Sequence, residues 1–116
     1  MKLFITTPIT SYQIDRVSQI EISTKDGQIT ILPDHMKLVT SMLAGLVSFV
    51  SSNNRYEYFI GDAIVMFENN EIKIITDYYT DVAKIEDLES YKNSLNIGYY
   101  IALESLVNNK HANTNN

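Results

Sequence analysis

Two histidines are the side chains in this sequence best suited to acid–base chemistry near neutral pH. His35 directly follows Asp34, and His111 lies in the polar terminal run KHANTNN. A general base needs a partner within hydrogen-bond reach, but neighbouring side chains in an extended segment point to opposite faces. We therefore expect His35 to shape a structural corner or a partner contact, with no catalytic or metal role, and His111 to be solvated.

Other residue patterns that carry chemistry are missing from the sequence. The 14 carboxylates are scattered without metal-ligand spacing, and the 4 glycines are too separate for a phosphate loop. No serine sits in a Gly-x-Ser-x-Gly elbow, and the absence of cysteine excludes a thiol nucleophile, a disulfide and a Cys-based zinc site. We therefore expect a non-catalytic protein without a cofactor or a bound metal.

Tyrosines gather in Tyr56–Phe59 and in the pair Tyr78-Tyr79. Aromatic side chains can stack nucleic-acid bases. However, the net charge is −5 and these tyrosines have few basic neighbours, whereas nucleic-acid and anionic-membrane binding depend on Lys and Arg. We expect the tyrosines to form cross-strand pairs or interface contacts, and we expect no nucleic-acid partner.

The sequence shows no membrane or export signal. Its first residues, MKLFITTPIT, lack the long apolar region of a signal peptide. No run approaches the roughly 20 apolar residues that a transmembrane helix needs. The expectation is a cytoplasmic protein that does not insert into a membrane.

Alternation of apolar and polar residues predicts about nine or ten short strands between residues 1 and 84. Turn signals separate them at Asp26-Gly27, Asn53-Asn54 and Asn69-Asn70, and Pro33 ends one strand. Many short strands need two layers to bury their apolar faces. We predict an antiparallel β-sandwich of about ten strands. The expected strand regions are 2–9, 11–24 with an irregularity at 15–16, 28–32, 38–43, 46–50, 56–60, 63–67, 71–76 and 77–84.

Beyond residue 84 the apolar period changes from 2 to 3.6, which predicts one helix over 85–109. Asp87 is the candidate N-cap, and Asn108-Asn109 is the expected end, with a frayed tail over 110–116. Tyr100 and Ile101 lie off the main stripe, so the helix has a second apolar face. Either a groove of the sandwich or a helix of a partner could cover it. The main stripe consists of Leu88, Tyr91, Leu95, Tyr99, Ala102, Leu103 and Leu106.

The run DGQITILPDHMKLVTSMLAGLV, residues 26–47, resembles one family, the epsilon subunit of F-type ATP synthases, called delta in mitochondria. Further similar runs are Val17-x-x-Ile20, Ile60-Gly61-x-Ala63 and residues 69–77. The order and spacing of these motifs carry the resemblance from Met1 to about Leu88. The residues of the first run that fall in register are Gly27, Ile31, Leu32, Pro33, His35, Leu38, Thr40 and Gly45.

The resemblance implies a β-sandwich followed by helix and a non-catalytic role at the foot of a rotating central stalk. The implied partners are the gamma subunit, the c ring in a full synthase, and indirectly the catalytic alpha/beta head, with the protein peripheral to the inner face of the cell membrane. In the family a helical hairpin can extend along gamma and slow ATP hydrolysis. The residues expected to contact a partner are Gln28, Ile31, Leu32, Pro33, Asp34, His35, Leu38, Tyr100 and Ile101.

Three departures from the family pattern limit what the resemblance implies. After Leu88 there is room for one helix and a short tail, so we expect no counterpart of the braking second helix. The ATP-binding run Ile-Asp-x-x-Arg-Ala is replaced by Ile85–Ser90, where Glu89 stands in place of the arginine and predicts no ATP binding. Gln28 is neutral where the family often has an acidic residue near the c ring.

Two alternative functions therefore stay open. The protein could be the epsilon-like subunit of a specialised F-type-like ATPase without a c ring, such as a motility motor. It could also be a stand-alone β-sandwich that binds a small ligand, which requires a concave apolar pocket with convergent polar groups.

Overall fold

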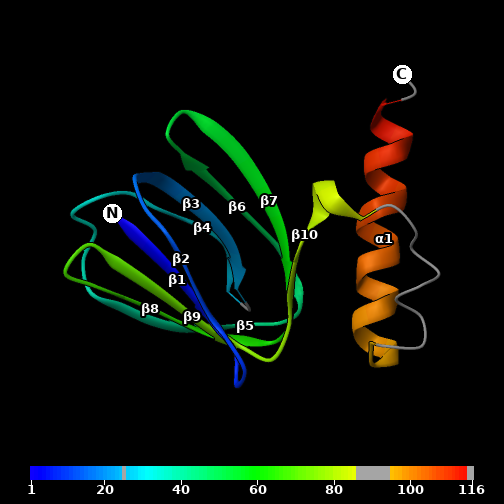
Figure 1. Ribbon diagram of the computed structural model, residues 1–116, viewed down its shortest axis with the longest axis horizontal. Coiled ribbons are helices and arrows are strands. Elements are labelled where there is room, and N and C mark those ends of the chain that lie inside the picture. Colours follow the sequence, from blue (N-terminus) through cyan, green and yellow to red (C-terminus); the bar gives the residue numbers. More distant parts are fainter. Residues whose placement is uncertain (25, 86–94, 115–116) are drawn as a thin grey trace.

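The computed structural model describes residues 1–24, 26–85 and 95–114. Ten strands form two sheets that face each other, and one helix lies beside them (Figure 1). The prediction of a ten-stranded β-sandwich followed by a helix is confirmed. The first sheet contains, in spatial order, β2 (Ser11–Ile14), β1 (Lys2–Thr6), β9 (Glu71–Thr76), β8 (Ala63–Glu68) and β5 (Leu38–Met42). The second contains β10 (Tyr79–Asp81), β7 (Asn54–Ile60), β6 (Gly45–Ser51), β3 (Val17–Thr24) and β4 (Gly27–Ile31).

One strand pair departs from the antiparallel arrangement that we predicted. β1 and β9 run parallel, with Leu3 opposite Ile72 and Ile5 opposite Ile74. Such a pair joins segments that are far apart in the chain, so local periodicity does not reveal it. The parallel pair places β1 inside its sheet, between β2 and β9.

The core lies between the sheets and follows the predicted alternation. Leu3 and Ile5 are fully buried, whereas Lys2 is exposed and Phe4 is half-buried on the opposite face of β1. The fully buried side chains of the facing sheet include Ile20, Ile22 and Ile60. Burial of these side chains provides the main driving force for folding.

Positive-φ residues mark the places where the chain turns. Asn69 and Asn70 have φ values of 54° and 58°, as their turn signal predicts. In the preceding hairpin, Ser52 and Asn53 have the positive φ values, so this turn begins one residue earlier than expected. Arg16, with φ 58°, divides the expected strand 11–24 into β2 and β3, which belong to different sheets.

The helix α1 covers Ile97–Thr114. The Asn96 side chain caps it, because Asn96 Oδ1 accepts a hydrogen bond of 2.8 Å from the Tyr99 amide. α1 thus begins later and ends later than the predicted helix over 85–109, of which residues 86–94, with the expected cap Asp87, lie outside the described residues. The helix continues through Asn108-Asn109, since asparagine lowers helix propensity only modestly. The short 3₁₀ helix η1 (Val82–Lys84) follows β10.

α1 packs on the outer face of the second sheet, on the side of β7 and β10 (Figure 1). Leu103 of the helix and Phe59 of β7 are both 0% exposed in this contact. The sandwich therefore covers the described part of the main stripe, from Leu95 to Leu106. The apolar cluster consists of Phe59, Val82, Tyr99, Leu103 and Val107, flanked by Ala44, Leu46, Tyr78, Ile85, Leu95, Ala102 and Leu106.

Candidate partner-binding surface

The segment 32–37, which we call the corner, carries the chain from β4 in the second sheet to β5 in the first. The His35 amide donates to the Leu32 carbonyl at 3.2 Å, and Asp34 between them has φ 65°. Pro33 followed by a positive-φ residue is the arrangement of a type II turn. The corner lies on the side of the sandwich away from α1 (Figure 1).

The structure brings only some of the predicted contact residues together. In and beside the corner, Leu32, Pro33, Asp34 and His35 are exposed and Leu38 is half-buried. Ile31 is 0% exposed, so its side chain offers no surface to a partner in this structure. Ile31 belongs to the inward face of β4, and its side chain packs in the core between the sheets.

The remaining predicted residues lie elsewhere. Gln28 is exposed on β4, where its Nε2 donates to Glu21 Oε2 at 3.5 Å. Tyr100 is buried and has little surface left for a partner, whereas Ile101 is 60% exposed on α1. A single contact cannot easily include both the corner and Ile101, because they lie on opposite sides of the molecule (Figure 1).

The His35 ring takes part in the packing of the corner. Its Nδ1 lies 2.8 Å from the Met36 carbonyl oxygen, and the ring meets Phe67 edge-on with centroids 5.9 Å apart. Over the described residues, no group of three or more His, Asp or Glu side chains is placed to hold a metal ion. The His35 ring therefore contributes packing against Phe67 and one contact with the backbone at the corner.

The outward side of the first sheet has an apolar face that we did not anticipate from the sequence. Ile64 lies opposite Ile75 across β8 and β9, and Met66 lies opposite Val39 across β8 and β5. Val39, Ile64 and Ile75 are 64%, 50% and 44% exposed. A signal was available, because an antiparallel sheet with one solvated face should alternate strictly, whereas AIVMF and IKIIT do not. We call Phe4, Val39, Ile64, Met66 and Ile75 the apolar face; the exposed Lys73 of β9 lies between Phe4 and Met66 on it.

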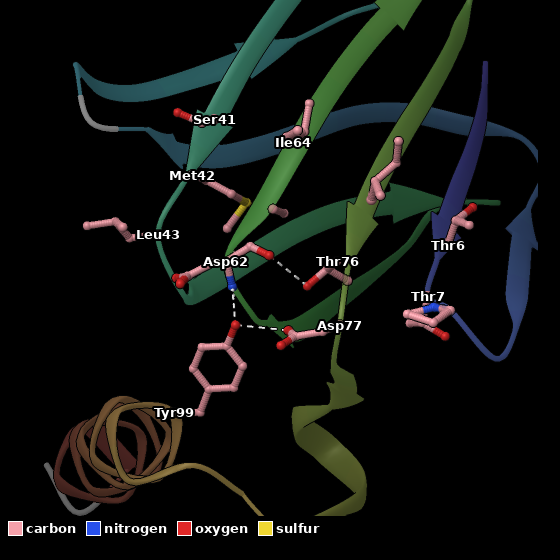
Figure 2. A pocket seen from close by; sticks show the side chains of 13 residues that line it. Thr6, Thr7, Ser41, Met42, Leu43, Asp62, Ile64, Thr76, Asp77 and Tyr99 are labelled. Carbon is pink, nitrogen blue, oxygen red and sulfur yellow. Dashed lines mark hydrogen bonds between the residues drawn. The ribbon is translucent and has the colours of Figure 1, made fainter.

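A groove of about 860 Å³ continues the apolar face at its end nearer α1. Ile64 and Ile75 belong to both, and Tyr99 reaches the groove from the helix (Figure 2). Its charged lining residues are Asp62 and Asp77. The groove is lined by Thr6, Thr7, Pro8, Ser41, Met42, Leu43, Asp62, Ala63, Ile64, Ile75, Thr76, Asp77 and Tyr99.

The Tyr99 hydroxyl is held in place at the groove (Figure 2). It accepts from the Asp62 amide at 2.9 Å and donates to Asp77 Oδ1 at 2.9 Å. Burial raises the pKa of Tyr99, and its hydrogen bond to Asp77 raises it further. The hydroxyl therefore remains protonated at neutral pH and serves as a donor.

Three other tyrosines pack together at one edge of the sandwich. Tyr12 of β2 stacks on Tyr58 of β7 and Tyr79 of β10, with centroids 6.5 and 6.2 Å apart. Burial raises the pKa of Tyr58, and the neighbouring Tyr12 hydroxyl adds to the shift. These rings pack on one another across the two sheets, in the packing role that we expected of Tyr58 and Tyr79.

The corner, the apolar face and the groove lie along one side of the first sheet, with an exposed ion pair of 3.5 Å between Lys37 and Glu68 beside the corner.

Within the described residues, no helix is both long and apolar enough to span a membrane.

Comparisons with known proteins agree with this architecture. The family model for the ATP synthase Delta/Epsilon chain, beta-sandwich domain, matches residues 1–81. The ATP synthase epsilon chain of Ureaplasma parvum is 30% identical over 99 residues, which cover 81% of this chain and 72% of that protein. The epsilon chain of Pelagibacter ubique is 26% identical over 94 residues, covering 80% and 70%.

Two solved structures share the fold. One comes from the central stalk and c ring of the Tetrahymena thermophila mitochondrial ATP synthase, with a TM-score of 0.66, 13% identity and coverage of 92% of this chain and 96% of that one. The other comes from the Euglena gracilis mitochondrial ATP synthase, with a TM-score of 0.64, 18% identity and coverage of 88% and 71%.

Proposed function

This chain belongs to the ATP synthase delta/epsilon family, and from this premise we propose that it is a non-catalytic central-stalk subunit that binds the gamma subunit. In that role it would sit at the foot of the stalk, on the cytoplasmic side of the membrane. It would couple rotation of the shaft to its load by giving the shaft a rigid base.

The apolar face is the observation that carries this proposal. Monomeric proteins rarely expose large contiguous apolar patches, and such patches mark protein contacts. Val39, Ile64 and Ile75 are each more than two-fifths exposed and lie on adjacent strands of one sheet. Gamma would cover this face, which runs between the corner at one end and the groove at the other.

The corner provides a second part of the proposed contact. Leu32 and Met36 are 51% and 81% exposed, and Val39 follows them closely in the chain. Apolar anchors of this kind supply most of the energy of an interface, while the surrounding polar residues supply orientation. We therefore propose that gamma contacts both the apolar face and the corner.

Contact with a c ring is a separate question. Gln28 lies on β4 of the second sheet, and its neutral side chain adds no charge to that surface. The alternative of a specialised F-type-like ATPase without a c ring therefore remains a distinct outcome of the test below.

The test is co-purification of the full chain with its gamma subunit, its c ring and its alpha/beta head, each expressed in turn. We expect a stable complex with gamma alone and no complex with alpha/beta alone. Failure to bind gamma would contradict the proposal. Binding to gamma together with failure to bind an assembled gamma–c ring complex would favour the specialised motor.

A thermal-shift screen tests the alternative of a small-ligand module. The groove of about 860 Å³ is large enough for a nucleotide or a sugar, so the screen should contain both. We expect no shift with Mg-ATP, because Glu89 stands in place of the family's arginine; Glu89 lies outside the described residues. A saturable shift would favour the ligand-binding alternative.

A further inference from the structure

We propose that the two hydrogen bonds of the Tyr99 hydroxyl, which we call the latch, fix the position of α1 on the sandwich. They also connect the helix to the end of the apolar face. The latch is a positioning contact within this chain. Its use in the assembly rests on the proposed function, but its existence can be tested on the chain alone.

The latch joins the two links that cross between the sheets at the groove. Asp62 lies between β7 of the second sheet and β8 of the first, and Asp77 lies between β9 of the first and β10 of the second. The Tyr99 hydroxyl bonds to the amide of the first link and to the carboxylate of the second, both at 2.9 Å (Figure 2). The Tyr99 hydroxyl of α1 is therefore bonded to both links between the sheets.

The two crossings are themselves connected to their surroundings. Asp62 Oδ1 accepts from the Ala44 amide at 2.9 Å, and the Thr76 hydroxyl donates to the Asp62 carbonyl at 3.1 Å. Thr76 ends β9 directly after Ile75 of the apolar face. The bonded network therefore extends from the helix to the strand ends that carry Ile64 and Ile75.

Gly61 provides the space that the latch needs. A Cβ atom at this position would lie 2.6 Å from Asp77 Oδ1 and 2.8 Å from the Tyr99 ring. Carbon atoms do not approach other groups so closely, so any side chain at position 61 would push the ring or the carboxylate away. The close approach of α1 to the sandwich therefore depends on glycine at position 61.

The apolar cluster beneath α1 explains why a latch has an effect. Phe59 and Leu103 are buried by the helix contact, but an apolar contact is non-directional and permits sliding. A hydrogen bond to a fixed carboxylate has a defined geometry. The latch therefore determines the position of α1 along the sheet.

Hydrogen exchange of the full chain tests the latch at individual amides. In Tyr99→Phe, we expect the Asp62 amide and the α1 amides over residues 101–107 to exchange about tenfold faster, as for loss of a hydrogen bond to a charged group. Amides in the centres of β3 and β6 should keep their wild-type rates. Unchanged exchange in α1, or an equal acceleration in β3 and β6, would overturn the proposal.

Variants of the partner residues make the test independent of the tyrosine. Asp77→Ala should accelerate the same amides, whereas Asp77→Asn keeps an acceptor oxygen and should stay close to wild type. Tyr99→Phe combined with Asp77→Ala should not exceed Tyr99→Phe alone by more than about twofold, because Tyr99→Phe already removes the bond to Asp77. Additive effects would contradict a direct latch.

A glycine pair supplies a matched control. Gly61→Ala should accelerate exchange in α1, because the new methyl group displaces the ring or the carboxylate. Gly98→Ala, where the nearest neighbour of the new methyl group would be Asn96 Oδ1 at 3.4 Å, should not accelerate it. Wild-type exchange in Gly61→Ala would overturn the requirement for close approach.

Discussion

Asp34 and Asn70 form two hydrogen bonds with each other although they are 36 positions apart in the chain. The Asp34 amide donates to Asn70 Oδ1 at 2.7 Å, and Asn70 Nδ2 donates to Asp34 Oδ1 at 3.1 Å. The pair connects the corner to the turn between β8 and β9. It therefore sets the position of the proposed gamma contact relative to the first sheet.

Asn70→Gly tests this connection, because glycine keeps the positive φ of 58° and removes only the side chain. We expect the free energy of unfolding to fall by about 1 kcal/mol, as for the net loss of one or two hydrogen bonds. Urea unfolding measures the change. Asn69→Gly is the control, since Asn69 has a similar φ of 54° and lies outside the pair; equal effects of the two variants would contradict the prediction.

Ile64→Lys tests the apolar face. Ile64 is 50% exposed, so we expect the variant to fold with a stability within about 1 kcal/mol of wild type. We expect its affinity for gamma to fall by roughly ten- to a hundredfold, as for a charge placed at the centre of an apolar interface. Titration calorimetry measures the affinity.

Thr30→Lys is the matched control for that charge. Thr30 is exposed on β4, which belongs to the other sheet. This variant should bind gamma like wild type. If Thr30→Lys weakens binding as much as Ile64→Lys does, gamma does not use the apolar face specifically.

Two neighbouring helix residues separate packing from partner contact. Leu103 is 0% exposed, so Leu103→Ala should lower the free energy of unfolding by about 2–4 kcal/mol through lost burial and a cavity. Ile101 is 60% exposed, and Ile101→Ala should change stability by less than about 0.5 kcal/mol. Denaturant unfolding followed by circular dichroism measures both.

The same Ile101 variant tests the predicted second apolar face of the helix. If a partner helix covers Ile101 in the assembly, Ile101→Ala will weaken the complex without destabilising the chain. Unchanged affinity for gamma and for the gamma–alpha/beta complex would remove Ile101 from the contact residues.

The raised pKa values of Tyr58 and Tyr99 predict that the protein loses stability at alkaline pH. Burial raises the pKa of both Tyr58 and Tyr99 above the ordinary value of 10.0. Above pH 10 the folded chain keeps these protons while the unfolded chain loses them. The contribution of the two tyrosines to the free energy of unfolding is therefore fully present below pH 10 and is lost as the pH rises further. Each tyrosine contributes a slope of up to about 1.4 kcal/mol per pH unit.

Tyr58→Phe should flatten this alkaline loss, and urea unfolding at pH 8, 10 and 11 measures it. Tyr56→Phe is the control, because Tyr56 lies on the same strand, β7, and is 38% exposed. An alkaline slope unchanged by Tyr58→Phe would show that other groups cause the loss.

Local patterns predicted most of the β body. Alternation at Leu3 and Ile5 identified the inward face of β1, and Asn69-Asn70 identified a hairpin, because a strand face and a turn depend on residues close together in the chain. The motifs of residues 26–47 indicated the family that the match over residues 1–81 shows. These features needed no knowledge of distant contacts.

The tertiary structure decided the features that depend on distant neighbours. Ile31 became a core residue because a facing sheet covers it, while Ile64 and Ile75 stayed exposed because their side of the first sheet has no covering layer within the described residues. The position of α1 follows from Tyr99 meeting Gly61 and Asp77, which are 38 and 22 positions away. Periodicity reports that a side chain is apolar, but only the folded arrangement determines what lies against it.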